Sequence, residues 1–212
     1  MIRDRAHCDS ANAELRFLVL MVGNFLSGSL GLHSICEDLA VRLADDGWGV
    51  LTTSSKRTPA ARLTDMLSTV IKRRNAFEVA QIDVYSGAAF IWAEAVCWTL
   101  RRLGKPYVLT LHGGNLPTFA ARYPGRVRRL LSSAKEVTTP SNYLLERMQA
   151  YRRSMRLLPN ALDVAAYRFT LRSHPQPRLI WVRSFHEIYN PAMAPRVIGL
   201  LKQEIPDIEL LM

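Results

Sequence analysis

Length, composition and charge restrict the class of protein. The chain has 212 residues, of which 49% are apolar, 8% aromatic and 22% charged, enough to bury a sizeable core in one or two globular domains. Its strongest candidate for a membrane or export segment, Leu15 to Val22, has eight residues, well short of the roughly 20 that a spanning helix needs, and it lacks the flanks of a signal peptide. The three cysteines are odd in number and show no ligand spacing, which indicates reduced thiols in a cytoplasmic protein.

The positive charge is concentrated in one segment. The formal net charge is +10, and residues 99–156 hold twelve Lys or Arg against two acids, so this segment carries the whole excess. Such a segment predicts an anionic partner, either a phosphorylated small molecule or the acidic leaflet of a membrane, unless it is simply a solvated helix face. Nucleic acid is the weakest candidate, because no zinc spacing, aromatic-basic motif or helix-turn-helix pattern accompanies the charge.

The first elements predicted along the chain are a strand, a glycine-containing loop and a helix. Residues 1–14 are polar and expected to be frayed, and the continuous apolar run Leu15 to Val22 is typical of a strand buried on both faces. A loop with three glycines follows. Ser34 and Glu37 then form a capping box, which predicts a helix that ends at Gly47 and carries three side chains inward: Ile35, Leu39 and Leu43.

The alternation of strands and helices continues through the next sixty residues. Trp48 to Thr53 reads as a strand, and Thr58 and Pro59 as the cap and first residue of a helix with apolar residues at helical spacing. Val79 to Tyr85 is a third strand. Residues 88–103 are apolar nearly all round, which predicts a helix packed in the interior, and residues 107–111 form the next strand.

The remaining pattern predicts a first domain that ends at a linker and a second that begins after it. A basic helix within residues 118–133, a strand at 136–139, a helix begun by Pro140 and Ser141, and a short strand at 155–158 complete the first. After a linker at 173–177, the pattern restarts with a strand, a helix and a strand, at 178–183, 191–203 and 208–212.

This order of elements predicts an α/β fold built on a Rossmann-like, doubly wound parallel sheet. The expected organisation is a frayed N-terminus (1–14), a first domain (15–172), a linker (173–177) and an incomplete second Rossmann-like domain (178–212). A βαβ unit of about 35 residues cannot cover both faces of its own sheet. We therefore expect the chain to be one piece of a longer protein.

A histidine stands where the fourth predicted strand ends. In open parallel sheets the ligand crevice lies beyond the carboxyl ends of the strands, so His112 is a candidate site residue. Gly113 and Gly114 would let a ligand approach the backbone, and Asn115 adds donors and an acceptor for sugar hydroxyls. The alternative is that His112 is a satisfied cap or core residue and that the glycines only turn the chain.

Three other features are candidate parts of a site. The loop from Gly23 to Ser34 precedes a helix N-terminus, which favours an anion such as a diphosphate, although it matches neither the dinucleotide fingerprint nor a GK[ST] motif and could be a plain turn. Arg183 ends the first strand of the second domain, where a guanidinium can bind a diphosphate in a bidentate manner. Glu94 lies in an apolar helix and must find a partner or face a cavity, and we favour a structural role for it.

Five motifs together resemble a known family. In chain order they are GSLGLHS, TLHGGN, PSNYL, PNALDVAAY and WVRSFHEIYNP, and they are similar to the retaining glycosyltransferases of family 4. The resemblance covers nearly all of residues 15–212. It implies a GT-B architecture of two Rossmann-like domains facing each other across a cleft, with no cofactor or catalytic metal, and a nucleotide-diphosphate sugar as donor substrate.

The same resemblance implies roles for individual residues. His112 would be the catalytic residue in contact with the transferred sugar, with the adjacent loop binding substrate. Arg183 would neutralise the leaving diphosphate, because negative charge grows on the leaving oxygen as the bond to it breaks. The implied substrate-binding set, which includes the donor-phosphate loop around Gly31 and the cleft residue Asn160, is Gly28, Ser29, Gly31, Gly113, Gly114, Asn115, Asn160 and Arg183.

The resemblance also implies an activity and a location. The activity is sugar transfer to a polysaccharide or glycolipid precursor of the cell envelope, in the cytoplasm or peripherally on the inner face of the membrane, with residues 99–156 docking on an anionic surface. The chain departs from the family pattern where Ile188, Tyr189 and Asn190 replace the usual lysine and where the E-x7-E element is absent, so we expect it to be inactive as it stands. The alternatives are a non-catalytic binding or partner subunit and a nucleotide-sugar epimerase.

Overall fold

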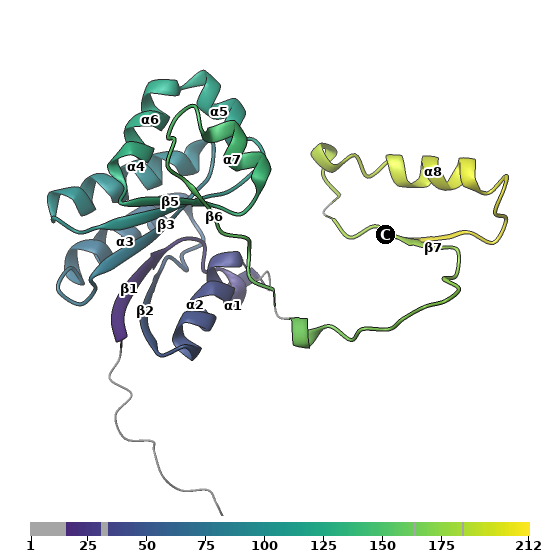
Figure 1. The fold of residues 1–212 in the computed structure, drawn as a ribbon, viewed down its shortest axis with the longest axis horizontal. Coiled ribbons are helices and arrows are strands. Elements are labelled where there is room, and N and C mark those ends of the chain that lie inside the picture. Colours follow the sequence, from purple (N-terminus) through teal and green to yellow (C-terminus); the bar gives the residue numbers. More distant parts are fainter. Residues whose placement is uncertain (1–15, 31–33, 163, 184) are drawn as a thin grey trace, which may run out of the picture. The chain divides into compact units, whose positions relative to one another are not determined.

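The chain folds into two compact units, Met1–Leu162 and Asp163–Met212. The computed structural model describes residues 16–30, 34–162, 164–183 and 185–212 (Figure 1). The expectations for residues 1–14 and for Gly31 lie outside the described residues. The boundary between the units lies ahead of the predicted linker at 173–177.

The first unit is built on a six-stranded sheet in the order β2-β1-β3-β4-β5-β6, and every neighbouring pair is parallel. This result confirms the α/β class with a Rossmann-like parallel sheet. The chain first steps from β1 to β2 and then crosses back over β1 to β3, so its direction across the sheet reverses between β1 and β3. The strands are β1 (Arg16–Val22), β2 (Trp48–Thr53), β3 (Val79–Val84), β4 (Tyr107–Leu111), β5 (Glu136–Thr139) and β6 (Arg156–Leu157).

Helices cover both faces of this sheet, which makes three layers. One face packs against α2, and the other packs against α3, α4, α6 and α7. Figure 1 shows α1 and α2 together beside β1 and β2. The helices are α1 (Ser27–Leu30), α2 (Ile35–Asp45), α3 (Pro59–Lys72), α4 (Ala88–Arg102), α5 (Leu116–Arg122), α6 (Pro124–Ser133) and α7 (Asn142–Met148).

Strand β1 shows why a central parallel strand has a continuous apolar sequence. Successive side chains of a strand point to opposite faces, so a strand covered on both sides needs apolar residues at every position. Leu20 and Val22 belong to the large cluster, whereas Val19 and Met21 belong to the smaller cluster with α2. The uninterrupted run predicted this strand for that reason.

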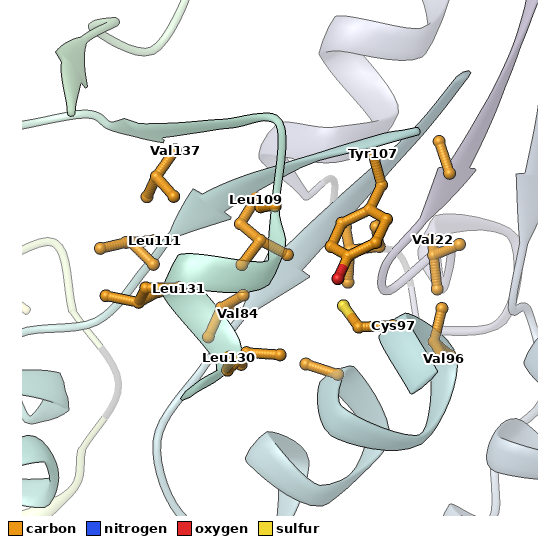
Figure 2. Close-up of a cluster of buried hydrophobic side chains, with 14 of the residues drawn as sticks. Val22, Val84, Val96, Cys97, Tyr107, Leu109, Leu111, Leu130, Leu131 and Val137 are labelled. Carbon is orange, nitrogen blue, oxygen red and sulfur yellow. The ribbon is translucent and has the colours of Figure 1, made fainter. Parts of the chain in front are cut away.

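The large cluster forms the main core, and β4 supplies its middle (Figure 2). Tyr107, Leu109 and Leu111 alternate along β4 and are almost fully buried. Figure 2 shows these three side chains directed toward Cys97 of α4 and Leu131 of α6. The Tyr107 hydroxyl donates a hydrogen bond to the Ser133 hydroxyl at 2.7 Å, which satisfies the one polar atom that this ring brings into the core.

Local signals placed the helix starts correctly but misjudged some exposed faces. The capping box of Ser34 and Glu37 forms, and the Thr58 side chain accepts a hydrogen bond from the Ala61 amide at the start of α3. Ile35, predicted to point inward, is instead 42% exposed. Leu39 and Leu43 do pack against the smaller cluster, as predicted, and the buried positions of α2 include Cys36 and Ala40.

Two longer predictions also need correction. The basic helix predicted within residues 118–133 is two helices, because Pro124 lacks an amide hydrogen and begins a new helix after the non-helical Tyr123. Helix α4, predicted to lie in the interior, has an outer face on which Ile91 and Trp98 are 52% and 54% exposed. Its apolar sequence therefore covers a surface as well as a core.

The second unit is a strand, a helix and a strand, as predicted from the restart of the pattern. Its two strands pair in parallel, and short 3-10 turns occur at Val164–Ala166 and Glu187–Tyr189. Among the described residues of this unit, Ile208 is the only hydrophobic side chain that is buried. The elements are β7 (Arg178–Ile180), α8 (Met193–Leu201) and β8 (Glu209–Leu211).

Adjacent residues of α4 give a matched test of where the core lies. Phe90 is fully buried in the large cluster, whereas the neighbouring Ile91 is about half exposed. We expect Phe90→Ala to lower the free energy of unfolding by about 3–5 kcal/mol, because it removes a ring and leaves a cavity. Ile91→Ala should change it by less than about 1 kcal/mol. Denaturant unfolding measures both values, and equal losses would contradict this orientation of α4.

Candidate functional site

The reversal of chain direction between β1 and β3 creates a pocket at the carboxyl edge of the sheet. The loops that follow these two strands run in opposite directions, so a space opens between them. The pocket is lined by the ends of both strands and by residues of α3 and α4, namely Val22, Gly23, Asn24, Met66, Ile82, Asp83, Tyr85, Ala89, Trp92 and Ala93.

His112 lies at the same edge, directly after β4. Its backbone amide donates to the Val84 carbonyl at 2.9 Å, which continues the hydrogen bonding between β3 and β4. The imidazole is 5% exposed, and its Nε2 donates to Asp83 Oδ1 at 3.1 Å. The Tyr85 ring stacks on it with centroids 5.1 Å apart. Among the described residues, none forms a hydrogen bond with Nδ1.

The Asp83 carboxylate belongs to a hydrogen-bond network that crosses three strands. Besides His112, its Oδ1 accepts a hydrogen bond at 2.8 Å from the Gln81 amide, which also donates to the Thr110 hydroxyl at 3.0 Å. That hydroxyl lies 3.0 Å from the hydroxyl of Thr138 on β5. A chain of polar side chains thus crosses β3, β4 and β5 on one face of the sheet, and His112 is at its end.

The second carboxylate oxygen of Asp83 lies against the first strand's loop. It is buried and has no hydrogen-bond partner within the described ranges. A Cβ built on Gly23 would lie 2.8 Å from this oxygen and 2.9 Å from the Cys36 sulfur, so only glycine fits between them. The sequence requires a glycine here because of this close approach.

Cys36 is a buried thiol and a poor nucleophile. Burial and the neighbouring Asp83 charge raise the pKa of Cys36 to about 12. The thiol therefore stays protonated near neutral pH, and only the thiolate is strongly nucleophilic. Burial and the same charge also raise the pKa of Tyr85. Cys36 and Tyr85 are thus held in their neutral forms.

Arg62 of α3 places a positive charge at this edge. Its guanidinium donates to the Asn24 side chain at 3.0 Å and to the backbone carbonyl of Lys56 at 3.2 Å, so it ties the loops after β1 and β2 together. It also lies 5.3 Å from the centroid of the Trp92 ring, a pocket residue. None of the carboxylates in the described part of the chain forms an ion pair with it.

The loop after His112 has the backbone shape that its glycines predicted. Gly113 has φ +86°, which disfavours any residue with a Cβ, and its carbonyl accepts from the Leu116 amide at 3.2 Å. Gly114 and Asn115 are exposed, and the Tyr143 hydroxyl of α7 lies 3.5 Å from the Gly114 carbonyl. The loop therefore presents backbone and amide groups at the edge where His112 lies.

The N-terminus of α2 is already occupied by a carboxylate of the chain itself. Glu37 accepts hydrogen bonds from the backbone amides of Ser27 at 2.9 Å and Ser34 at 2.8 Å. Burial opposes ionisation of Glu37, but these hydrogen bonds outweigh it and lower its pKa. An anion from solution would therefore compete with Glu37 for these two amides.

The remaining predicted site residues lie in different places. Gly28 and Ser29 belong to the short helix α1, Gly28 is exposed, and Gly31 is outside the described residues. Asn160 is exposed and follows β6. Arg183 belongs to the second unit, where its guanidinium carbon lies 4.6 Å from the Tyr189 ring centroid. The structure thus groups His112 with its own loop, and a shared site with Arg183 stays a prediction.

Glu94 has the structural partner that its position required. It forms a bidentate ion pair with the Arg126 guanidinium, whose Nε lies 3.0 Å from its Oε1, and this pair joins α4 to α6.

Within the described ranges, no group of three or more His, Cys, Asp or Glu side chains is arranged to hold a metal ion.

Sequence reasoning missed Asp83, Tyr85 and Arg62 as members of this site, and it included Gly23 only as the first residue of the candidate loop that ends at Ser34. One signal was present for Asp83, which is an acid inside a largely apolar strand and must have a partner if it is buried. No comparable signal marks Arg62, because the chain contains many arginines. Its position depends on two loops that follow different strands.

Comparison with known protein families identifies the family of this chain. The family model described as Glycosyltransferase Family 4 matches residues 32–166, which is more than half of the chain. The matched segment includes His112, its glycine loop and Asn160, and it ends before Arg183. No curated protein matches the chain significantly.

Adjacent glycines of the His112 loop test its backbone geometry. A Cβ on either Gly113 or Gly114 would meet no atom within 4 Å, but only Gly113 has a positive φ. We expect Gly113→Ala to lower the free energy of unfolding by about 1–2 kcal/mol through backbone strain alone. Gly114→Ala should change it by a few tenths of that. Thermal or denaturant unfolding would disprove the loop shape if the two variants were equally stable.

The raised thiol pKa values predict a loss of stability at alkaline pH. The pKa of Cys36 is raised from 9.0 to about 12, and burial also raises the pKa of Cys97 to about 12. The unfolded chain therefore releases these protons first, so their contribution is complete below about pH 9 and is lost as the pH rises toward 12. Denaturant unfolding at several pH values measures this slope. A variant with both cysteines replaced by alanine should have a shallower slope, and an unchanged slope would contradict the prediction.

Proposed function

Because this chain belongs to glycosyltransferase family 4, we propose that it acts in a retaining transfer of a sugar from a nucleotide-diphosphate sugar to a polysaccharide or glycolipid precursor. One observation carries this proposal. A buried histidine and a glycine loop lie at the carboxyl edge of the sheet, within the segment that the family model matches. This is the edge where ligands bind in open α/β sheets.

The proposed role of His112 is to contact the transferred sugar. Asp83 fixes the ring through Nε2. Nδ1 is then the ring nitrogen that would exchange a hydrogen bond with a sugar hydroxyl. Tyr85 holds the plane of the ring by stacking. Gly113, Gly114 and Asn115 would bind the same substrate through exposed backbone and amide groups.

The proposed role of Arg183 is to neutralise the diphosphate as it leaves. Negative charge grows on the leaving oxygen when the sugar-phosphate bond breaks, and a guanidinium can bind two phosphate oxygens at once. Gly28, Ser29 and Gly31 would approach the donor phosphates, and Asn160 would lie at the cleft. Since Glu37 already uses two amides near α1, the phosphates would have to use other groups of that loop.

We also propose that the protein works in the cytoplasm, at the inner face of the membrane. None of the helices in the described part of the chain has the length and apolar character needed to cross a bilayer. Lipid-linked acceptors are presented at a membrane surface, and the basic segment 99–156 would favour an anionic one.

A second function, that of a non-catalytic partner subunit, is favoured by the surface of the second unit. Large apolar side chains such as Ile180, Val182 and Leu200 are 67%, 76% and 70% exposed there. Exposed apolar surface of this kind fits a unit that is covered by another polypeptide. Such a subunit would bind its partner without turning over any nucleotide sugar.

Sugar transfer tests the proposed function directly. Because we expect the 212 residues to be inactive as they stand, the test uses the protein as its gene encodes it, and radiolabelled UDP- and GDP-sugars are offered with a lipid extract as acceptor. His112→Ala and Arg183→Ala should each lower kcat/KM by about a hundredfold, because each removes a group that contacts the reacting sugar phosphate. The matched controls are His174→Ala and Arg172→Ala, whose side chains are exposed in the second unit.

The outcomes separate the functions considered. Unchanged turnover in both site variants would disprove the residue assignments. A sugar that is isomerised without any acceptor would indicate an epimerase. No turnover of any donor, together with a stable complex with another polypeptide, would favour the partner subunit.

A further inference from the structure

Helix α4 has two faces with different roles. Its inner face contributes Phe90 and Val96 to the core, and Ala89 and Trp92 line the pocket that Asp83 also lines. Its outer face carries Ile91 and Trp98, seven residues apart and therefore on one side of the helix, each more than half exposed. Burial in the core of this unit does not explain these two large apolar side chains.

Cations surround this exposed apolar stripe. Arg101 and Arg102 follow Trp98 by one helical turn, and the Arg102 guanidinium carbon lies 5.1 Å from the Trp98 ring centroid. Arg129 of α6 faces the same hollow between α4 and α6, together with Ile91 and Trp98. None of the acids in the described ranges forms an ion pair with these three arginines. The one acid that lines the hollow, Glu94, is already paired with Arg126.

The combination of charge and apolar surface selects a type of partner. A solvated helix face would explain the arginines but not the aligned Ile91 and Trp98. Nucleic acid would attract the charge, but an aliphatic side chain offers no contact with phosphates and no hydrogen bond with base edges. A bilayer interface satisfies both features, because tryptophan sits at the headgroup level while arginines attract anionic headgroups.

We propose that the face formed by Ile91, Trp98, Arg101, Arg102 and Arg129, here called the α4–α6 face, docks the protein on an anionic lipid surface. This inference rests on the proposed function in one respect: the proposed lipid-linked acceptor gives the protein a reason to bind a membrane. Helix α4 would lie parallel to the bilayer, with its apolar side chains between the lipid headgroups and its arginines against their phosphates.

The position of α4 links this surface to the candidate site. The helix begins four residues after the end of β3, so Ile91 in its first turn is close to the edge that carries Asp83 and His112. The inner face of the same turn lines the pocket through Ala89. Docking through the outer face would therefore keep this edge of the sheet, with Asp83 and His112, near the headgroups, where a lipid-linked acceptor presents its polar end.

Vesicle binding tests the docking surface. The chain is mixed with vesicles of phosphatidylcholine alone or of phosphatidylcholine and phosphatidylglycerol, and binding is measured by cosedimentation and by Trp fluorescence. Wild-type protein should bind only the anionic vesicles, and less tightly as salt increases. The triple variant Arg101→Ser, Arg102→Ser, Arg129→Ser should lose about a hundredfold in affinity, since each charge near such a surface is worth roughly fivefold. Trp98→Ala should lose roughly tenfold.

Matched controls distinguish a specific surface from net charge. The triple variant Arg168→Ser, Arg172→Ser, Arg196→Ser removes the same charge from exposed positions of the second unit, and Phe169→Ala removes an aromatic ring that is 88% exposed. Both should bind the anionic vesicles like wild type. Unchanged thermal unfolding of every variant would show that the fold is intact.

Several results would overturn the inference. These are no binding to anionic vesicles, equal losses in the two triple variants, an unaffected Trp98→Ala variant, or tighter binding to a DNA duplex than to the vesicles. Failure of the proposed function is a separate result, because vesicle binding does not depend on sugar transfer. A protein that binds vesicles through this face but turns over no nucleotide sugar would disprove the transferase proposal alone.

Discussion

The carboxyl edge of the first unit is organised around one buried carboxylate. Asp83 accepts hydrogen bonds from His112 and Gln81, its second oxygen presses against Gly23, and its charge contributes to the raised pKa of Cys36. A buried carboxylate is tolerated only when hydrogen bonds replace its lost hydration. The histidine that we place in contact with substrate is thus also one of the groups that stabilises the end of β3. The hydrogen bond between Asp83 and His112 therefore serves both the fold and the proposed chemistry.

Topology explains why this carboxylate meets these partners. Parallel strands end at a common edge, and the crossover from β2 to β3 puts β3 beside both β1 and β4. Asp83 therefore has the β1 loop on one side and His112 on the other. The helices complete the arrangement, because the residue after each loop is fixed by a cap or by core packing, as Ser34 is by Glu37. Helix caps encoded in the local sequence thus fix where each loop ends, and tertiary packing then brings these loop ends together.

Much of this fold is predictable from the sequence, and the exceptions have physical causes. The apolar runs identified the strands, and the change from YVLTL to HGG located His112 at a strand end. The bond between His112 and Asp83 was not predictable, because it depends on the register in which Val84 pairs with Leu111. Helix α4 was misjudged because apolar residues on every side do not reveal which side meets solvent. Ile91 and Trp98 could be assigned only once α6 was in place.

Glu37 gives the loop after β1 a built-in competitor. Its carboxylate binds the amides of Ser27 and Ser34, the same kind of groups that would otherwise cradle a phosphate. A phosphorylated molecule that binds these two amides must displace a tethered anion of the chain, so its binding free energy is weakened by the free energy of that internal contact. A single change at this position during evolution would unmask the cradle. The affinity that we propose for donor phosphates would then depend on the side chain at position 37.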